Sequence, residues 1–106
     1  MAKFLIEANY TPEGAKGVIK DGGSGRRAAI EKAVAGLGGR LEAFYFAFGK
    51  VDAYVIVDLP DNATAAAMAF AVSQSGLAST RTVVLLTMEE TDAATKKTVS
   101  YRAPGK

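Results

Sequence analysis

Apolar and polar residues alternate in four stretches of the chain, and each stretch predicts a β-strand. The four stretches are residues 3–10, 41–48, 51–59 and 80–87. In the first, the apolar side chains at even positions share one face, so this face is expected to lie in the core. The second stretch is apolar on both faces, and Gly49-Lys50 after it predicts a tight hairpin turn into the third.

Helix signals separate the strands. Thr11-Pro12-Glu13 predicts a helix start, with Thr as the N-cap residue and Pro in the first turn. Asp21-Gly22-Gly23 predicts a break in this helix, and Ser24 restarts a helical segment that Gly38-Gly39 closes.

Two further helices are expected in the second half of the chain. Asp61 caps an Ala-rich helix over residues 62–75, which approaches the sheet closely because its side chains are small. Thr87-Met88-Glu89-Glu90 has the capping-box pattern and predicts a last helix that ends at about Val99.

This order, β-α-β-β-α-β with a C-terminal helix, predicts an α+β, ferredoxin-like plait with the strand order 4-1-3-2. We expect one domain over residues 1–100 and a tail over residues 101–106. Two helices cover one face of such a sheet, and the other face would expose Leu5, Tyr54 and Ile56 to water. A second subunit packed on this bare face would give a dimeric α/β barrel, so we expect a homodimer or a higher homo-oligomer.

The hairpin region carries a family resemblance. Gly49, Asp52, Pro60 and Asp61 stand in the run from Phe44 to Asp61, where an aliphatic strand leads into a Pro-Asp helix start. This run resembles the GYD domain family, although Val51 stands where that family has Tyr. The resemblance covers roughly residues 3–90 and implies a small bacterial protein with the dimeric α/β barrel fold. It implies no particular activity.

Composition narrows the chemistry. The 106 residues include no Cys, no His and no Trp. This excludes a disulfide, a thiolate nucleophile and a His general base, and we expect no metal and no cofactor. The net charge of +2 comes without a basic stripe between aromatic residues, so we expect no nucleic-acid partner. The apolar runs are too short for a membrane span, and a cytoplasmic location is expected.

The first candidate site lies on the bare face of the sheet. Strand pairing would bring Glu7 beside residues of the third strand and within reach of Arg81 of the fourth. Carboxylates gathered there could perform acid/base chemistry, or the same groups could form an ion pair that fixes the dimer register. The candidate ligand-binding residues are Glu7, Asn9, Tyr45, Asp52, Tyr54 and Arg81.

The second candidate is the Gly-rich segment from Asp21 to Arg27. Free backbone N–H groups at Ser24, together with Arg26 and Arg27, could bind a phosphate or carboxylate, although the P-loop pattern is missing. The alternative is a break between two helices with a solvated basic start.

A third candidate is an aromatic set, which could line a pocket for a planar ligand between sheet and helices or could simply form the core. Its members are Tyr10, Phe44, Tyr45, Phe46, Phe48, Tyr54 and Phe70.

These features favour a small oligomeric binding or accessory protein without enzymatic activity. The sequence does not identify its ligand, and a small molecule is the candidate. The alternative is a cofactor-independent monooxygenase or isomerase that acts on an aromatic or lactone substrate, by analogy with other proteins of this fold.

Overall fold

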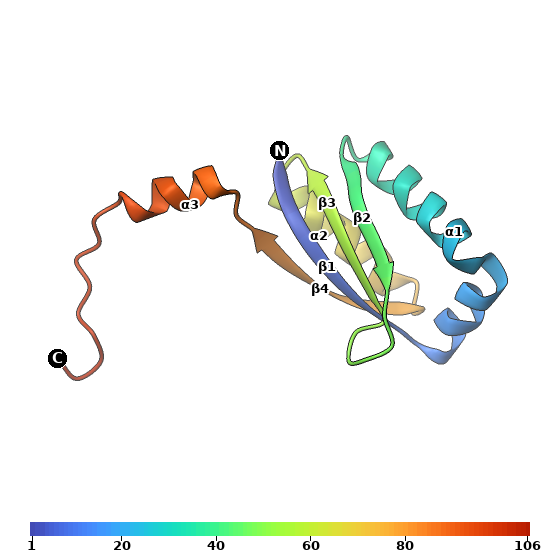
Figure 1. Ribbon diagram of the computed structural model, residues 1–106. Coiled ribbons are helices and arrows are strands. Elements are labelled where there is room, and N and C mark those ends of the chain that lie inside the picture. The colour runs from blue at the N-terminus through green and yellow to red at the C-terminus, as the bar shows by residue number, and fades with distance from the viewer.

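The computed structural model describes residues 1–106 as a four-stranded antiparallel sheet with helices on one face (Figure 1). The elements follow the expected order, and the strands lie in the order β2-β3-β1-β4. Their bounds are β1 Ala2–Tyr10, α1 Pro12–Gly36, β2 Arg40–Phe46, β3 Ala53–Leu59, α2 Asn62–Gln74, β4 Ala78–Leu85 and α3 Met88–Thr95. The chain therefore has the α+β, ferredoxin-like plait that the sequence predicts.

The helices begin and break where the capping residues predict. The hydroxyl of Thr11 accepts a hydrogen bond from the backbone N–H of Gly14, and the carboxylate of Asp61 accepts one from that of Thr64. Inside α1, Gly22 has φ +74°, which interrupts the helical conformation and divides α1 into two segments. A left-handed φ of this kind costs glycine little, so the break is encoded at this residue.

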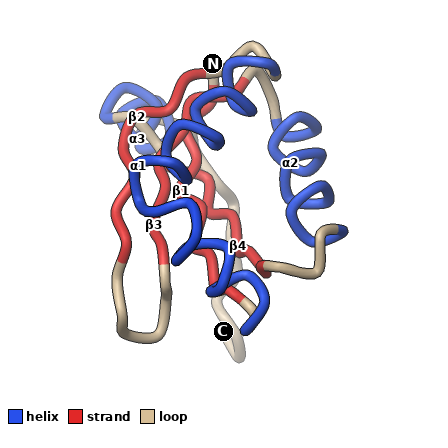
Figure 2. Tube along the Cα trace, turned by 90° about the vertical axis from the view of Figure 1, so that its right-hand side faces the viewer, coloured by secondary structure: helices blue, strands red, loops and turns tan.

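The core lies between the sheet and the helices. Alternate strand residues and three helix positions form one cluster, in which Phe4, Leu59, Val34 and Val57 are the most completely buried side chains. Figure 2 looks onto this side, with α1 in front of the strands and α2 beside it. The opposite face of the sheet carries no helix, as expected.

The connection between β2 and β3 corrects the expected tight turn. β2 ends at Phe46 and β3 begins at Ala53, so residues 47–52 form a loop, in which Phe48 is fully exposed. The backbone N–H of Asp52 donates to the carbonyl of Ala8, which draws this end of the loop onto β1. The side chain of Val51 is buried. Burial and pairing at the end of the loop thus outweigh the local preference for a turn at residues 49–50.

A β-bulge in β2 corrects the expected facing of that strand. Leu41 pairs with Val57 and Ala43 pairs with Ile56, so one extra residue stands in β2. Leu41 therefore points into the core, whereas strict alternation would place it on the same face as Ala43 and Tyr45.

Two other boundaries also differ from expectation. β4 begins at Ala78 and ends at Leu85, and α3 ends at Thr95 rather than near Val99. α3 and the residues after it extend away from the sheet (Figure 1). None of the helices combines the length and the apolar character that a membrane span requires.

Candidate functional site

A cleft lies between the two helices that cover the sheet. α1 packs mainly on β2 and α2 mainly on β4, which are the two edge strands. Because the helices are placed over the edges, the central strands are left uncovered between them and form the floor. The cleft has a volume of about 540 Å³ and continues into a smaller hollow of about 70 Å³ above the strands. This volume is in the range of small-molecule sites.

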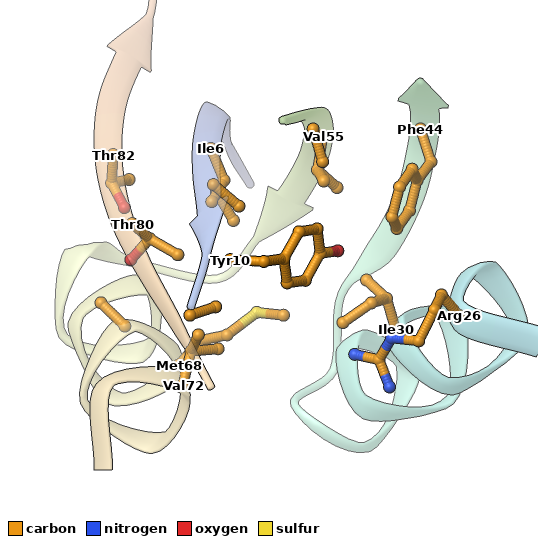
Figure 3. Close-up of a pocket in the computed structure, with 14 residues that line it drawn as sticks. Ile6, Tyr10, Arg26, Ile30, Phe44, Val55, Met68, Val72, Thr80 and Thr82 are labelled. Atoms are coloured by element: carbon orange, nitrogen blue, oxygen red, sulfur yellow. The ribbon is translucent and has the colours of Figure 1, made fainter. Parts of the chain in front are cut away.

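The walls of the cleft are mostly apolar. They come from both helices and from the strands, and the shared lining of the cleft and its hollow consists of Tyr10, Arg26, Ile30, Met68, Val72 and Ala78. Figure 3 shows the Tyr10 ring lying across the floor and pointing toward α1, where Arg26 and Ile30 lie. Phe44 of β2 stands beside them. An apolar cleft with few polar groups at one end is typical of a site for an amphipathic small molecule.

Arg26 is brought to the cleft by the break in α1. The break at Gly22 places Asp21 in one helical segment and Arg26 in the next, and their side chains meet with Nη1 and Oδ2 3.6 Å apart. This contact is the one ion pair that Arg26 makes. A guanidinium has five N–H donors, so Arg26 retains donors for a bound anion.

Tyr10 is held in the cleft by its backbone. Its N–H donates to the Oδ2 atom of Asp52 at 2.9 Å, which fixes the end of β1. Burial raises the pKa of the Tyr10 hydroxyl, and the nearby positive charge of Arg26 opposes this shift. The phenol therefore keeps its proton at neutral pH and can donate a hydrogen bond.

On the bare face, the structure brings together part of the first candidate site. In the sheet register, Glu7 of β1 pairs with Tyr54 of β3 and with Arg81 of β4. The carboxylate of Glu7 accepts a hydrogen bond from Arg81 at 3.1 Å. Tyr45 pairs with Tyr54 in the sheet register. This geometry agrees with the interpretation of Glu7 and Arg81 as a cross-strand ion pair. The side chain of Arg81 is nevertheless 75% exposed in the single chain.

Asn9 and Asp52 serve the loop between β2 and β3. The side-chain amide of Asn9 donates to the carbonyl of Lys50 at 2.8 Å, and Asp52 accepts the backbone N–H of Tyr10. Both side chains are thus used to tie the loop to the end of β1, and neither lines the cleft.

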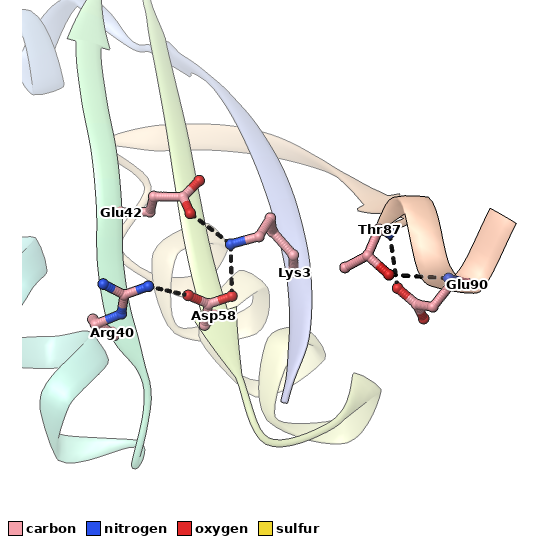
Figure 4. Close-up of polar contacts among 6 residues, drawn as sticks. All are labelled: Lys3, Arg40, Glu42, Asp58, Thr87 and Glu90. Carbon is pink, nitrogen blue, oxygen red and sulfur yellow. Dashed lines mark hydrogen bonds and ion pairs between the residues drawn. The ribbon is translucent and has the colours of Figure 1, made fainter. Parts of the chain in front are cut away.

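A charged cluster at the opposite end of the bare face was missed from the sequence (Figure 4). The ammonium of Lys3 contacts Glu42 at 2.7 Å and Asp58 at 2.8 Å, and Arg40 contacts Asp58 at 3.1 Å. The hydrogen bond from Lys3, with help from Arg40, lowers the pKa of Asp58, and the bond to Asp58 in turn raises the pKa of Lys3. Strand pairing places Lys3 opposite Asp58, and this register could have predicted the charged cluster from the sequence.

The remaining candidates divide between the cleft and the surface. Of the anion-binding set, Arg26 lines the cleft, whereas Ser24 and Arg27 are exposed outside it. Of the aromatic set, Tyr10 lines the cleft and Phe44 lines the hollow below it, and Phe46 packs beside Phe44 with ring centroids 5.0 Å apart. Phe48 and Phe70 are exposed. No group of three or more carboxylates gathers as metal ligands would.

The antiparallel sheet, its one-sided helix layer and the cleft between the helices define an α+β protein of the ferredoxin-like type with room for a small molecule. The chain belongs to the GYD domain family, because the model of the GYD domain matches residues 4–95. Comparison with curated proteins and with solved structures finds no match. The family assignment confirms the resemblance seen at the hairpin.

Proposed function

We propose that this protein is a small homo-oligomeric binding protein, and that its cleft binds a planar, apolar organic molecule with one anionic group. The observation that carries this proposal is the meeting of Arg26 and Tyr10 at one end of an apolar cleft of about 540 Å³. The apolar walls would cover the ring system of the ligand. Arg26 would form charge-assisted hydrogen bonds with a carboxylate, and the neutral phenol of Tyr10 would donate another.

Binding is favoured over catalysis by the groups in the cleft. Its ionisable side chains are Tyr10, Asp21 and Arg26. Asp21 is engaged by Arg26, and the pKa of Tyr10 is raised away from neutrality. A general base works best when its pKa lies near the operating pH, and the phenol of Tyr10 does not meet that condition.

The test is titration with 2-naphthoate, followed by NMR of the backbone amides and by calorimetry. We expect shifts at residues of the cleft and weaker binding of the neutral analogue 2-naphthylmethanol. Arg26→Met should weaken naphthoate binding by about tenfold to a hundredfold, because it removes a charge-assisted contact. Arg27→Met is the matched control, since Arg27 is the neighbouring arginine and lies outside the cleft. Equal losses in both variants, or amide shifts away from the cleft, would contradict the proposal.

The second part of the proposal is that another copy of this chain covers the bare face. This face exposes apolar side chains, including Tyr45, Tyr54 and Val83. Its charged side chains are already paired within the chain, so packing a second sheet against it would not strand an unpaired charge. A face of this kind can pack against its own copy about a two-fold axis.

Light scattering at micromolar concentration tests the homo-oligomer. We expect no monomer for the wild type, and a monomer for Val83→Asp, which places a charge on the bare face. Phe70→Asp is the matched control, because Phe70 is an exposed apolar side chain of α2, on the helix-covered side of the sheet. A wild-type monomer that retains its full circular dichroism spectrum would overturn this part.

A further inference from the structure

The C-terminal arm, which we define as residues 86–106, projects from the end of β4. Every residue from Leu86 to Arg102 is exposed. Four of the arm's side chains are large and apolar, and between about half and three quarters of the surface of each faces solvent: Leu86, Met88, Val99 and Tyr101. Apolar side chains in such a number are usually covered in a soluble assembly.

α3, inside the arm, is a properly started helix without a packing partner. The hydroxyl of Thr87 accepts from the backbone N–H of Glu90, and the Glu90 carboxylate accepts from that of Thr87 (Figure 4). None of its residues is buried. Isolated helices shorter than roughly 12–15 residues are marginal in water, so a cap alone does not keep eight residues helical. The match to the GYD domain nevertheless extends to residue 95, the last residue of α3.

The arm projects on the bare side of the sheet. In Figure 1 α1 and the arm lie on opposite sides of the strands, and in Figure 2 α1 is in front of the strands while α3 lies behind them. Val83 and Leu85 of β4 pair with Leu5 and Lys3, so they belong to the bare face, and Leu86 follows directly. The apolar residues of the bare face therefore extend to Leu85, the last residue of β4 before the arm.

Charge also favours a second copy as the occupant. α3 carries the acidic residues Glu89, Glu90 and Asp92, and none of them forms an ion pair. Residues 12–40 contain six basic and three acidic side chains. A second copy thus offers an apolar face to the apolar side chains of the arm and a positive surface to α3, whose charged residues are all acidic. The four basic residues of the arm, Lys96, Lys97, Arg102 and Lys106, follow α3.

We infer that the arm clasps a second copy of this chain, with Leu86 and Met88 packed on the copy that sits on the bare face. This inference rests on the proposed homo-oligomer and adds the segment that closes it. In a two-fold dimer each chain would give one arm and receive one, and α3 would gain its missing packing partner in this way.

Because the chain has no cysteine, one spin label can be placed on the arm at Ala93→Cys. Spin-labelled chains without ¹⁵N are mixed with ¹⁵N-labelled wild-type chains that carry no spin label. Any loss of amide signal on the body of a ¹⁵N chain then comes from the arm of another copy. We expect selective losses on the body. A label at Lys16→Cys, on the outer surface of α1, is the control and should give none at the positions that the arm affects.

Failure of the clasp and failure of the homo-oligomer give different results. Wild type that is dimeric by light scattering but shows no loss from the Ala93 label overturns the clasp and leaves the dimer. Wild type that is monomeric overturns both.

A second measurement uses the full chain with Leu86→Ser and Met88→Ser together. We expect the dimer dissociation constant, measured by analytical ultracentrifugation, to rise at least tenfold, and hydrogen exchange at α3 amides to become fast. Phe70→Ser is the control, because Phe70 is an exposed apolar residue of α2 that lies outside both the arm and residues 12–40. An unchanged dissociation constant, or α3 protection in wild type that does not increase with protein concentration, would contradict the clasp.

Discussion

The two faces of the sheet are built from the same four strands and are finished in opposite ways. On the helix side the strand residues carry no charge, and side chains such as Phe4 and Val57 are closed off from water within the chain. On the bare side apolar residues alternate with charged ones, and each charge has a partner. The chain therefore buries the apolar side chains on the helix side of the sheet. On the bare side it pairs the charged side chains with one another and leaves the apolar side chains exposed to solvent.

The ion pairs of the bare face also differ from the ion pair at the cleft in their distances. The pairs on the bare face are short, at 2.7–3.1 Å, and link different strands of the sheet. The pair between Arg26 and Asp21 at the cleft is longer, at 3.6 Å, and joins two segments of a broken helix. The short pairs suit a fixed structural surface, and the looser pair leaves an arginine able to bind another anion.

The sharpest way to test this difference is to truncate two adjacent residues of β1. Phe4 is 1% exposed on the helix side, and Leu5 lies on the bare side. Phe4→Ala should lower the free energy of unfolding by roughly 3–5 kcal/mol at any protein concentration, because it leaves a cavity in the core. Leu5→Ala should cost less in dilute protein, and its cost should grow with concentration as the interface fills. Urea denaturation at two protein concentrations measures both, and equal, concentration-independent losses would remove the distinction between the faces.

Strand faces were predictable where alternation is strict. In β1 the side chains at positions 4, 6 and 8 of the expected core face are buried, while Tyr10 of the same face is half-buried in the cleft. The strand order and the pairing of Glu7 with Arg81 also follow the prediction. The prediction is wrong in β2, because alternation assumes one residue per step and the bulge at Leu41 inserts an extra one. The loop over residues 47–52 was missed because contacts with distant residues of β1 hold it.

The cleft was only partly predictable. The aromatic residues and Arg26 entered as two separate candidates, since they lie in different parts of the sequence. What unites them is the lateral placement of α1 and α2 over the edge strands, which depends on helix packing and leaves no local pattern. The cluster around Lys3 was missed for a related reason, because it requires three strands in register.

Asp52 tests whether the loop and the cleft are independent. Its carboxylate accepts the backbone N–H of Tyr10, so Asp52→Asn should lower the free energy of unfolding by about 1 kcal/mol through a weaker hydrogen bond. Naphthoate binding should remain, because the Tyr10 ring keeps its place in the cleft. Urea denaturation and calorimetry on the same variant give the two values. If stability is unchanged and binding is lost, Asp52 acts in ligand binding rather than in holding the loop.

The ion pair between Glu7 and Arg81 tests how far the bare face is exposed to solvent. With Arg81 75% exposed, the pair is a surface ion pair in the single chain, and a double-mutant cycle should give a coupling of about 0.2–1 kcal/mol. Glu7→Gln, Arg81→Met and the double variant form the cycle, measured by urea denaturation. The coupling should increase at concentrations where the dimer forms, because a second sheet would remove water from the pair. Strict additivity at every concentration would show that the two side chains do not interact in solution.

The smallest expected effect concerns Asp58 and acid. Lys3 and Arg40 hold the pKa of Asp58 below its usual range, so the folded state favours the carboxylate more than the unfolded state does. The resulting stabilisation is complete above the unfolded pKa of about 3.9 and is lost as the pH falls through the lower pKa of the folded state. Between about pH 5 and about pH 2, the free energy of unfolding should fall less steeply for Asp58→Asn than for wild type. Glu31→Gln is the control, because Glu31 is an exposed residue of α1 that forms no ion pair, and its curve is expected to follow that of the wild type. Parallel curves for all three proteins would mean that the cluster around Lys3 contributes nothing to folding, and the bare face would then owe its stability to its apolar residues alone.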